Sequence, residues 1–474
     1  MSILFLILFL VPFAASAAAF MFRHIPKWYA VVLSCVPLAI LIAGQGRWIG
    51  SNIQYAWFPA MSIQFHLNID ALSLVFLYLT AVIIPISLLA AGSLAYAHIF
   101  YGLVFLLQGL LIGFFTARDL AVFTIFWEAM LIPLYFIINL WGGPQRQMAS
   151  LKFLIYMIAG SVLMVAAVLA LYFAAGKSFN LDTLAGVSAG APYAVWLFGI
   201  FMLAFAVKTP LFPFHAWLPD AYCQAPVAGT ILLSAILSKA GIYGILRIGM
   251  ELFPTLLQEW SPLLLGLSIA GVFYGGFAAW MQRDFKRLIA YSSFSHVNFV
   301  MVGLFVWSQT AHSGAILQAL NHGITIAALF LVAGWLEERL GTTSFGHVSG
   351  LAKFLPQLCW LTLLFVLSSV ALPGTNSFVG ELLILFGLFV NYPWAAAFLA
   401  LTVILSVIYM LRWMQKVYFD EPSLFQDSWM DITVKELAIA APLAFLILWI
   451  GIYPAPVLNQ IKPASQKIIA EETT

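Results

Sequence analysis

The apolar residues of this chain fall into continuous runs of about 17 to 25 residues, the length that a helix needs to cross a bilayer. Strands of a membrane β-barrel alternate apolar and polar residues over about ten positions, a pattern that these runs do not follow. Only 8% of the 474 residues are charged, whereas a soluble domain has about 25%. The runs therefore predict an all-α polytopic membrane protein.

Hydropathy divides the chain into about fourteen spans, and no stretch between them suits a soluble domain. The opening segment, MSILFLILFLVPFAASAAAF, has the small residues of a signal-peptide cleavage site but no basic start, so we interpret it as the first span. The predicted ranges are 3–21, 28–44, 70–91, 98–117, 120–140, 151–175, 194–214, 225–250, 262–281, 288–306, 312–336, 355–390 (broken), 393–415 and 435–453.

Lysines and arginines in the predicted loops favour an orientation with both termini on the outer side. With the N-terminus outside, six cations lie on the outer side: Arg47, Arg118, Lys177, Arg247, Lys462 and Lys467. Twelve lie in inner loops: Arg23, Lys27, Arg146, Lys152, Arg283, Lys286, Arg287, Arg339, Lys353, Arg412, Lys416 and Lys435. This two-to-one bias predicts both termini outside.

Two predicted spans are interrupted by helix-breaking residues. VKTPLFP at 207–213 interrupts the seventh span, and ALPGTNSFVGE at 371–381 interrupts the twelfth. Elements that repeat after five spans have opposite topology, which is typical of inverted-repeat transporters with discontinuous helices. Proline and glycine are also common in membrane helices, so chance is the alternative.

Four charged residues lie at mid-depth in four different predicted spans. Glu128 follows Asp119 by nine residues, which at 1.5 Å per residue places it roughly 14 Å deep, near the membrane midplane. Lys208, Lys239 and Glu381 each lie within a different span. A charge at a helix centre costs about 2.5–3.5 kcal/mol, so four unpaired charges would cost roughly 10–14 kcal/mol.

This cost must be offset by pairing, internal water or neutralisation of the lysines. A static ion pair between Glu128 and Lys208 that fixes helix packing is one reading. However, two carboxylates and two lysines on four spans exceed what packing requires, and ionisable groups within membrane helices mark proton and ion pathways. Pro210 and Pro213 also free backbone carbonyls beside Lys208, and such groups persist only beside protein or a hydrated cavity.

Histidines add candidate relays. His296 and His322 lie in the stretch 288–336, which contains no Asp, Glu, Lys or Arg. Each could be a satisfied core residue, but imidazole titrates near pH 6.5, so a pair of them suits proton transfer. His215, near the inner end of the seventh span, is interpreted as an interface residue.

Other chemistries lack a sequence signal. The chain has no nucleotide-binding glycine motif and no CxxC run, and its net charge of +2 does not indicate nucleic acid. We interpret Cys35, Cys223 and Cys359 as apolar filler. We therefore expect no cofactor and no metal in this chain.

Four segments resemble the antiporter-like subunits of respiratory complex I, and the likeness extends over about residues 60–455. The H-x-W-L-P-D-A signature at 215–221 is specific to this superfamily. Glu381 resembles the glutamate of the M-type branch, the counterpart of mitochondrial subunit 4, where L-type and N-type chains carry lysine. The segments are FWEAMLIPLYFIINLWG, AVKTPLFPFHAWLPDAYCQAPVAGTILLSAILSKAGIYGILR, RDFKRLIAYSSFSHVNFVMVGL and LPGTNSFVGELLILFG.

The resemblance implies a role for each buried residue. Glu128 is similar to the glutamate that pairs with the seventh-helix lysine, here Lys208. Lys239 resembles the central lysine of the proton path. His296 and His322 resemble the histidines that link this lysine to the exit side, and Glu381 resembles the terminal proton carrier.

The resemblance also implies an architecture and partners. It implies fourteen helices in one membrane domain, 1–474, and a proton-translocating role in NADH:quinone oxidoreductase in a bacterial inner membrane, with both termini periplasmic. FMN, iron–sulfur clusters and quinone are expected in partner subunits, and L-type and N-type chains and lipids as neighbours. The implied parts are N-terminal helices 1–91, a first repeat 98–250 (helices 4–8), an inverted second repeat 262–417 (helices 9–13) and a C-terminal helix 435–453.

Two alternatives are open. One is a subunit of an Mrp-type sodium/proton antiporter, against which Glu381 argues, or of a membrane-bound hydrogenase; these proteins share the lysines and the signature. The other is a scaffold that moves no protons. The sequence departs from the family at Val297 and Asn298, where related chains often have methionine and glycine, which puts the local packing in doubt.

Overall fold

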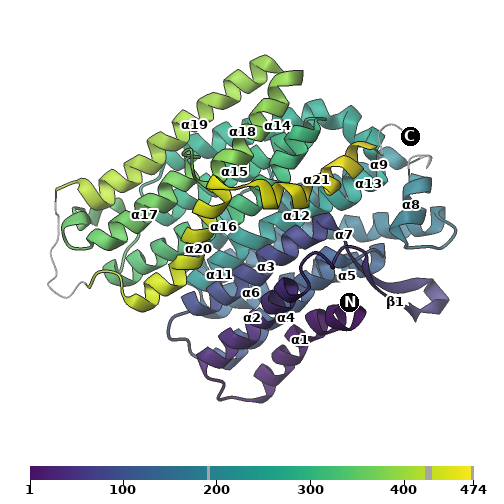
Figure 1. Cartoon of the computed structure of the whole chain (residues 1–474), viewed down its shortest axis with the longest axis horizontal. Coiled ribbons are helices and arrows are strands. Elements are labelled where there is room, and N and C mark those ends of the chain that lie inside the picture. Colours follow the sequence, from purple (N-terminus) through teal and green to yellow (C-terminus); the bar gives the residue numbers. More distant parts are fainter. Residues whose placement is uncertain (189–192, 348, 422–429, 471–474) are drawn as a thin grey trace. The chain divides into compact units, whose positions relative to one another are not determined.

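The computed structural model describes residues 1–188, 193–347, 349–421 and 430–470, and helices dominate it (Figure 1). Within this part of the chain, eleven helices are long and apolar enough to cross a membrane, and four shorter apolar helices accompany them. The predicted all-α polytopic fold class is confirmed. The count of fourteen crossings stays a prediction.

The chain forms two compact units. Unit 1 comprises residues 1–209, 224–261 and 463–474, and unit 2 comprises 210–223 and 262–462. The break after Lys208 is where the chain passes from unit 1 to unit 2, and residues 210–223 group with the C-terminal helices. The predicted single domain and its two repeats stay predictions.

Unit 1 holds the N-terminal helices and a β-hairpin. Its elements are α1 (Ser2–Met21), α2 (Lys27–Ala43), β1 (Ser51–Phe58), β2 (Ile63–Ile69), α3 (Ala71–Ala90), α4 (Ala97–Thr116), α5 (Leu120–Ala129), α6 (Leu131–Trp141), α7 (Arg146–Ala174), α8 (Leu181–Ser188), α9 (Ala194–Lys208), α11 (Val227–Leu232), α12 (Ser238–Gly244) and α13 (Met250–Leu252).

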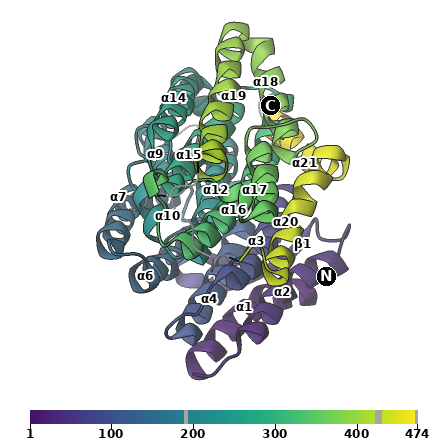
Figure 2. The same ribbon diagram turned by 90° about the vertical axis from the view of Figure 1, so that its left-hand side faces the viewer.

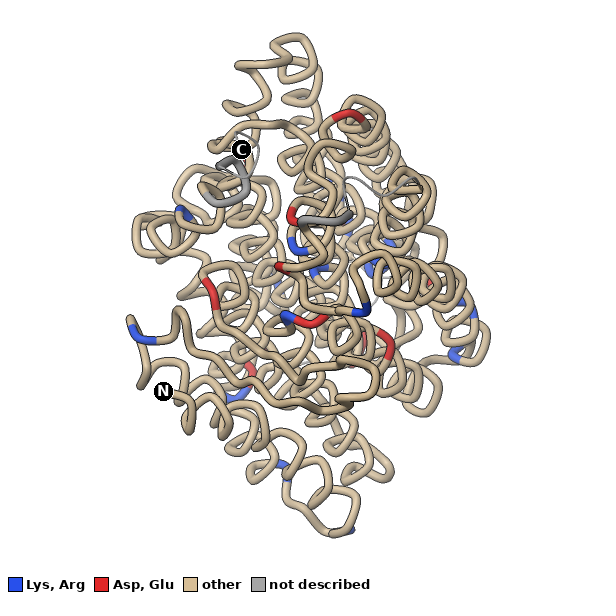
Figure 3. Tube along the Cα trace, turned by 90° about the vertical axis from the view of Figure 1, so that its right-hand side faces the viewer, with Lys and Arg blue, Asp and Glu red and all other residues tan. Residues whose placement is uncertain are grey.

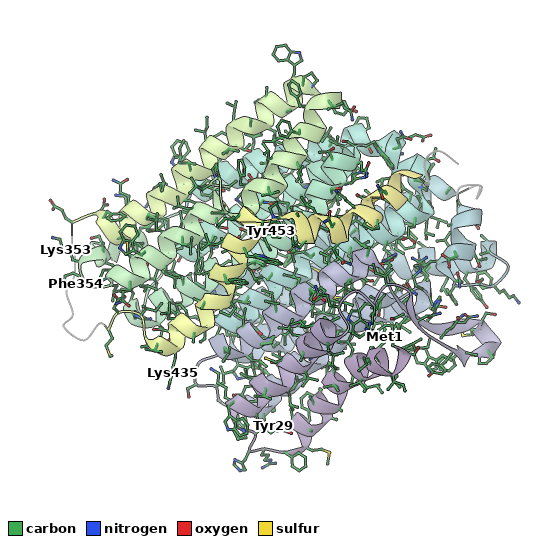
Figure 4. All side chains as sticks on the ribbon, in the orientation of Figure 1. Met1, Tyr29, Lys353, Phe354, Lys435 and Tyr453 are labelled. Carbon is green, nitrogen blue, oxygen red and sulfur yellow. The ribbon has the colours of Figure 1, made fainter. Side chains whose placement is uncertain are left out.

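The first helices of unit 1 pack closely because α4 carries small residues. Figure 4 labels Met1 at the start of α1 and Tyr29 beyond the turn that follows it, and α1 packs against both α2 and α4. A Cβ atom on Gly109 of α4 would lie 2.7 Å from the ring of Phe13 on α1, and one on Gly102 would lie 2.9 Å from the ring of Phe20. Glycines let membrane helices approach in this way.

The long interval between the second and third predicted spans forms a hairpin. β1 pairs antiparallel with β2, with Ser51 opposite Ile69 and Ile53 opposite Leu67. The alternation of apolar and polar residues along 63–69 is the period-2 pattern of a strand, although no strand was predicted here. Asp70 then caps α3 by accepting a hydrogen bond from Ser73 N at 2.8 Å.

Unit 2 holds the C-terminal helices. In Figure 2, α18 and α19 lie side by side, and α18 also packs against α16 and α20. Figure 4 shows Lys435 at the beginning of α20 and Tyr453 after its end. The elements are α10 (Leu218–Gln224), α14 (Pro254–Met281), α15 (Phe285–Phe305), α16 (Gln309–Leu340), α17 (Pro356–Ser369), α18 (Asn376–Asn391), α19 (Pro393–Met414), α20 (Val434–Ile452) and α21 (Ala455–Ala470), of which α10, α14 and α21 extend partly into unit 1.

Both predicted helix breaks are present. α9 ends at Lys208 and helix resumes only at Leu218, while α17 ends at Ser369 and α18 begins at Asn376. The turn 371–374 contains positive φ angles at Ala371 (56°) and Gly374 (94°), values that end a helix. The breaks therefore lie where proline and glycine interrupt the apolar runs.

Candidate functional site

Glu128 lies at the end of α5, the helix that Asp119 caps. Figure 3 shows how sparse charged residues are along the chain. The atom Glu128 Oε1 is buried, with no hydrogen-bond partner among the described residues. A buried carboxylate oxygen without a donor costs free energy, and a proton or a cation that reached it would remove that cost.

Lys208 is the last residue of α9 and is only 1% exposed. Its Nζ donates to the carbonyl oxygen of Trp127 at 2.9 Å and lies 3.4 Å from the centroid of the Trp127 ring. The ammonium group thus has one hydrogen-bond acceptor and one aromatic face, and a cation over a desolvated indole is stabilised by about 2 kcal/mol.

The expected pairing of Glu128 with Lys208 is therefore indirect in this conformation. Within the described chain, no direct salt bridge joins the two side chains; Lys208 instead contacts Trp127, the residue before Glu128, and the two charges interact through space. The sequence predicted the neighbourhood of the two groups but not the acceptor, since a backbone carbonyl leaves no sequence signal.

Lys239 is fully buried in α12. Its Nζ donates to the carbonyl oxygen of Ser234 at 2.7 Å and to Ser238 Oγ at 3.1 Å. π-Helical segments lie on both sides, at Leu233–Leu237 and Ile245–Gly249. Such segments widen the hydrogen-bonding pattern of a helix and occur often at functional sites.

The two lysine-bearing helices meet at their backbones. A Cβ atom on Gly241 would lie 2.0 Å from Thr209 Oγ1 and 2.9 Å from the carbonyl oxygen of Phe205. Gly241 follows Lys239 by two residues, and Thr209 follows Lys208 directly. The absence of a side chain at Gly241 therefore sets how closely α12 approaches the end of α9.

We expect Gly241→Val to push α12 away from α9 and to lower the free energy of unfolding by about 1–3 kcal/mol, the usual cost of overpacking. Thermal unfolding of the purified protein in detergent measures this. Gly199→Val is the matched control, because it places the same β-branched residue in α9, where an added Cβ meets no atom within 4 Å. Equal melting temperatures for the two variants would contradict the close approach.

In unit 2, three predicted residues form one cluster. His296 of α15 places Nδ1 3.2 Å from Glu381 Oε1 of α18. The rings of His296 and His322 of α16 have centroids 6.0 Å apart. The three side chains are buried. They form a row of titratable groups on three helices, as a proton relay requires.

Gln318 is a member of this cluster that sequence reasoning missed. Its Nε2 donates to Glu381 Oε1 at 3.2 Å. A Cβ atom on Gly380 would lie 2.3 Å from Gln318 Oε1, so the glycine beside Glu381 makes room for the amide. Gln318 precedes His322 by four residues on α16, one helical turn, which is the only sequence sign of its position.

Polar side chains satisfy the backbone at the break before Glu381. Asn321 Nδ2 donates to the carbonyl oxygen of Asn376 at 2.7 Å, and Asn376 Nδ2 donates back to that of Asn321 at 3.2 Å. Ser368 and Thr325 both donate to Asn376 Oδ1, at 2.7 and 3.3 Å. These bonds hold the beginning of α18, and with it Glu381, against α16.

A second charged cluster in unit 1 was not predicted. Arg247 binds Asp70 and Glu251 at 2.7 Å each, and Arg118 binds Glu251 at 2.9 Å and Asp182 at 2.6 Å. Both arginines were expected only as cations on the outer side of the membrane. The available signal was the i,i+4 spacing of Arg247 and Glu251; the other pairs are remote in sequence.

Asp70 shows how strong this cluster is. Burial raises the pKa of the Asp70 carboxyl group, but the Arg247 charge and the hydrogen bonds from Arg247 and Ser73 outweigh burial and hold the pKa well below its usual range. Asp70 is therefore ionised at any physiological pH, and the cluster keeps its charges.

Among the described residues, no three His, Cys, Asp or Glu side chains come together as metal ligands. Cys35, Cys223 and Cys359 are free thiols.

Comparison with known proteins identifies the family to which the chain is related. Residues 117–423 match the family described as NADH:quinone oxidoreductase/Mrp antiporter, TM. The chain is 36% identical to NADH-quinone oxidoreductase subunit M of Escherichia coli (strain K12), over 92% of this chain and 91% of that protein. It is also 36% identical to the protein of that name from Mycobacterium tuberculosis (strain H37Rv), over 97% and 92%.

Solved structures agree on the fold. A chain of respiratory complex I from Thermus thermophilus with bound NADH superimposes with a TM-score of 0.92 at 31% identity, over 98% of this chain and 99% of that chain. A chain of the Mrp complex from Dietzia sp. superimposes with a TM-score of 0.88 at 21% identity, which shows the fold alone.

The family match spans more than half of the chain, and relatives of 36% identity cover more than nine-tenths of it. The chain is a multi-pass membrane protein of the NADH:quinone oxidoreductase/Mrp antiporter family, and it belongs to the branch of NADH-quinone oxidoreductase subunit M.

Proposed function

We propose that this chain is a proton-translocating membrane subunit of an NADH:quinone oxidoreductase, the respiratory complex I. The observation that carries the proposal is the pair of buried titratable clusters in otherwise apolar helices. In unit 1, Lys208 contacts Trp127 beside Glu128, and Lys239 lies on α12, which packs against α9; in unit 2, His296, His322 and Glu381 cluster together. Ionisable groups inside membrane helices are energetically costly, and such groups usually mark an ion or proton pathway.

The first cluster loads and releases a proton electrostatically. When the Glu128 carboxylate approaches Lys208, it stabilises the ammonium form, and when it withdraws, Lys208 gives up its proton toward Lys239. The contact of Lys208 with the carbonyl and ring of Trp127 supports this scheme, because it holds the ammonium group beside Glu128 without a direct bond.

The second cluster passes the proton on. His296 and His322 bridge toward Glu381, whose carboxylate binds His296 and Gln318. An imidazole binds a proton on one nitrogen while it releases another, so the histidines act as relays and Glu381 as the terminal carrier.

Energy for the cycle comes from other subunits. We propose that FMN, iron–sulfur clusters and quinone reside in partner chains, and that this chain holds no cofactor. Its neighbours are L-type and N-type antiporter-like subunits and lipids. The chain thus belongs to the translocase part of the enzyme, and a signal from a neighbour separates Glu128 from Lys208.

We place the chain in a bacterial inner membrane with both termini periplasmic. The excess of cations in loops of one side supports this orientation. In unit 2, Lys353 and Lys435 lie toward the same end in Figure 4. Glu436, the residue that follows Lys435, pairs with Arg339 at 2.8 Å. Under the positive-inside rule this end faces the cytoplasm.

A sodium/proton antiporter subunit or a membrane-bound hydrogenase subunit is the second candidate, since the Mrp complex shares the fold. Native purification with a tag on this chain separates the candidates. We expect NADH-oxidising activity with flavin and iron–sulfur absorbance to co-purify. Nickel–iron centres, or the absence of any redox partner, would instead indicate a hydrogenase or an antiporter.

A further inference from the structure

Asn298 lies fully buried in α15 of unit 2. Its Nδ2 donates to the carbonyl oxygen of Pro210 at 3.2 Å and to that of Phe294 at 2.8 Å. Its Oδ1 accepts from the backbone N of Phe212 at 3.4 Å. One amide thus contacts both a donor and an acceptor of the broken segment that follows Lys208.

The broken segment needs such a partner. Prolines 210 and 213 donate no backbone hydrogen bond, and the helix ends at Lys208, so carbonyl groups at membrane depth lose their helical donors. A buried carbonyl without a donor costs about 1–3 kcal/mol. Among uncharged side chains, an amide is suited to this position because it donates and accepts at once.

The neighbouring helix is shaped to admit the amide. A Cβ atom on Gly271 of α14 would lie 2.3 Å from Asn298 Oδ1 and 2.5 Å from Asn298 Cγ. The broken segment also packs on these helices through His215, whose ring centroid lies 4.3 Å from that of Phe294 and 4.8 Å from that of Tyr274. Asn298 is thus the polar side chain in a closely packed contact between α14, α15 and the broken segment.

We infer that Asn298 is a positioning residue that couples the broken segment after Lys208 to helix α15 and thereby to His296 and Glu381. Pro210 follows Lys208 by two residues, and Asn298 follows His296 by two residues. A shift of the chain at Lys208 therefore pulls on α15 through a hydrogen-bonded side chain. The inference rests on the proposed function and adds a link between the two proton-carrying clusters.

The test uses the intact complex in vesicles, with NADH oxidation and lumen acidification recorded together. Asn298→Leu has nearly the same volume and no hydrogen bonds. We expect the complex to assemble and NADH-driven lumen acidification per assembled complex to fall about 30-fold, the effect of losing the two hydrogen bonds to the broken segment at ~1 kcal/mol each. Assembly with unchanged acidification per assembled complex would overturn the inference, because a merely structural role alters the yield of the complex and not its turnover.

Gly271→Ala keeps the test decisive if Asn298→Leu does not assemble. The alanine methyl group displaces the amide, so we expect a similar loss of coupling with Asn298 present and no further loss in an Asn298→Gly background. An equal effect in both backgrounds would overturn the inference. Lys208→Met in the same assay tests the proposed function separately: normal pumping there would reject that function itself, whichever result Asn298→Leu gives.

Discussion

Lys208→Met should reduce NADH-driven proton pumping on the order of 100-fold or more while the complex still assembles. Methionine fills a similar volume without a titratable group, so the side chain can neither hold nor release a proton. The loss corresponds to the lower range for removing a positioned acid or base. The assay is lumen acidification by the complex in vesicles, normalised to the assembled complex.

Lys353→Met is the matched control for that substitution. Lys353 lies in a short 3₁₀ turn, is exposed, and is visible at one end of unit 2 in Figure 4. We expect pumping at the wild-type rate from this variant. Similar losses from Lys208→Met and Lys353→Met would show that the burial of Lys208 is irrelevant and would contradict the proposed role.

Arg247→Ala should destabilise the chain by about 2–3 kcal/mol, because it removes charge-assisted hydrogen bonds and leaves the partly exposed Asp70 carboxylate without its cation. The substitution removes the salt bridges to Asp70 and Glu251 and the hydrogen bond from Arg247 Nε to the Tyr243 hydroxyl at 3.0 Å. Arg247→Lys should rescue only part of the loss, because an ammonium group lacks the fork of donors. Thermal unfolding and the yield of assembled complex measure the effect.

Arg287→Ala provides the comparison. Arg287 pairs with Asp220 at 3.0 Å, but 44% of its side chain is exposed, and exposed pairs contribute about 0–1 kcal/mol. We expect a melting temperature close to that of the wild type. A loss from Arg247→Ala no greater than that from Arg287→Ala would contradict the account of the buried cluster.

The same cluster predicts an acid dependence. The pKa of Asp70 is held below its unfolded value, so its contribution to stability is full above about pH 4 and is lost as pH falls through the depressed folded pKa. In Arg247→Ala the cation that lowers this pKa is gone, so the folded and unfolded pKa values of Asp70 converge and the loss of stability below about pH 4 should shrink. Melting temperatures along a pH series measure it, and parallel curves for the two proteins would contradict the assignment.

Long apolar runs and their interruptions made the helices predictable. The run that ends at Lys208 and the motif at 371–381 placed both breaks correctly, because proline and glycine act locally. Buried charges were equally visible, since any charge inside a long apolar run stands out. Helices, helix breaks and buried charges depend on local sequence and could therefore be predicted from it.

Contacts between remote segments could not be predicted. The acceptor of Lys208 is the backbone of Trp127, and the partner of Arg247 is Asp70, 177 positions away in the chain. The π-helical turns beside Lys239 also left no signal, because SAILSK is compatible with an ordinary helix. From the sequence, Asn298 was noted only as a departure from the family. Its hydrogen bond to the carbonyl oxygen of Pro210 is visible only in the structure.

The central claim is that redox chemistry in partner subunits is coupled through the Glu128–Lys208 pair of this chain. Glu128→Ala in the intact complex, reconstituted in vesicles, tests it most directly when NADH oxidation by quinone and lumen acidification are recorded together. Loss of both activities in a fully assembled complex is the predicted result. Unchanged oxidation with unchanged acidification would contradict it and would leave the buried charges with a structural role only.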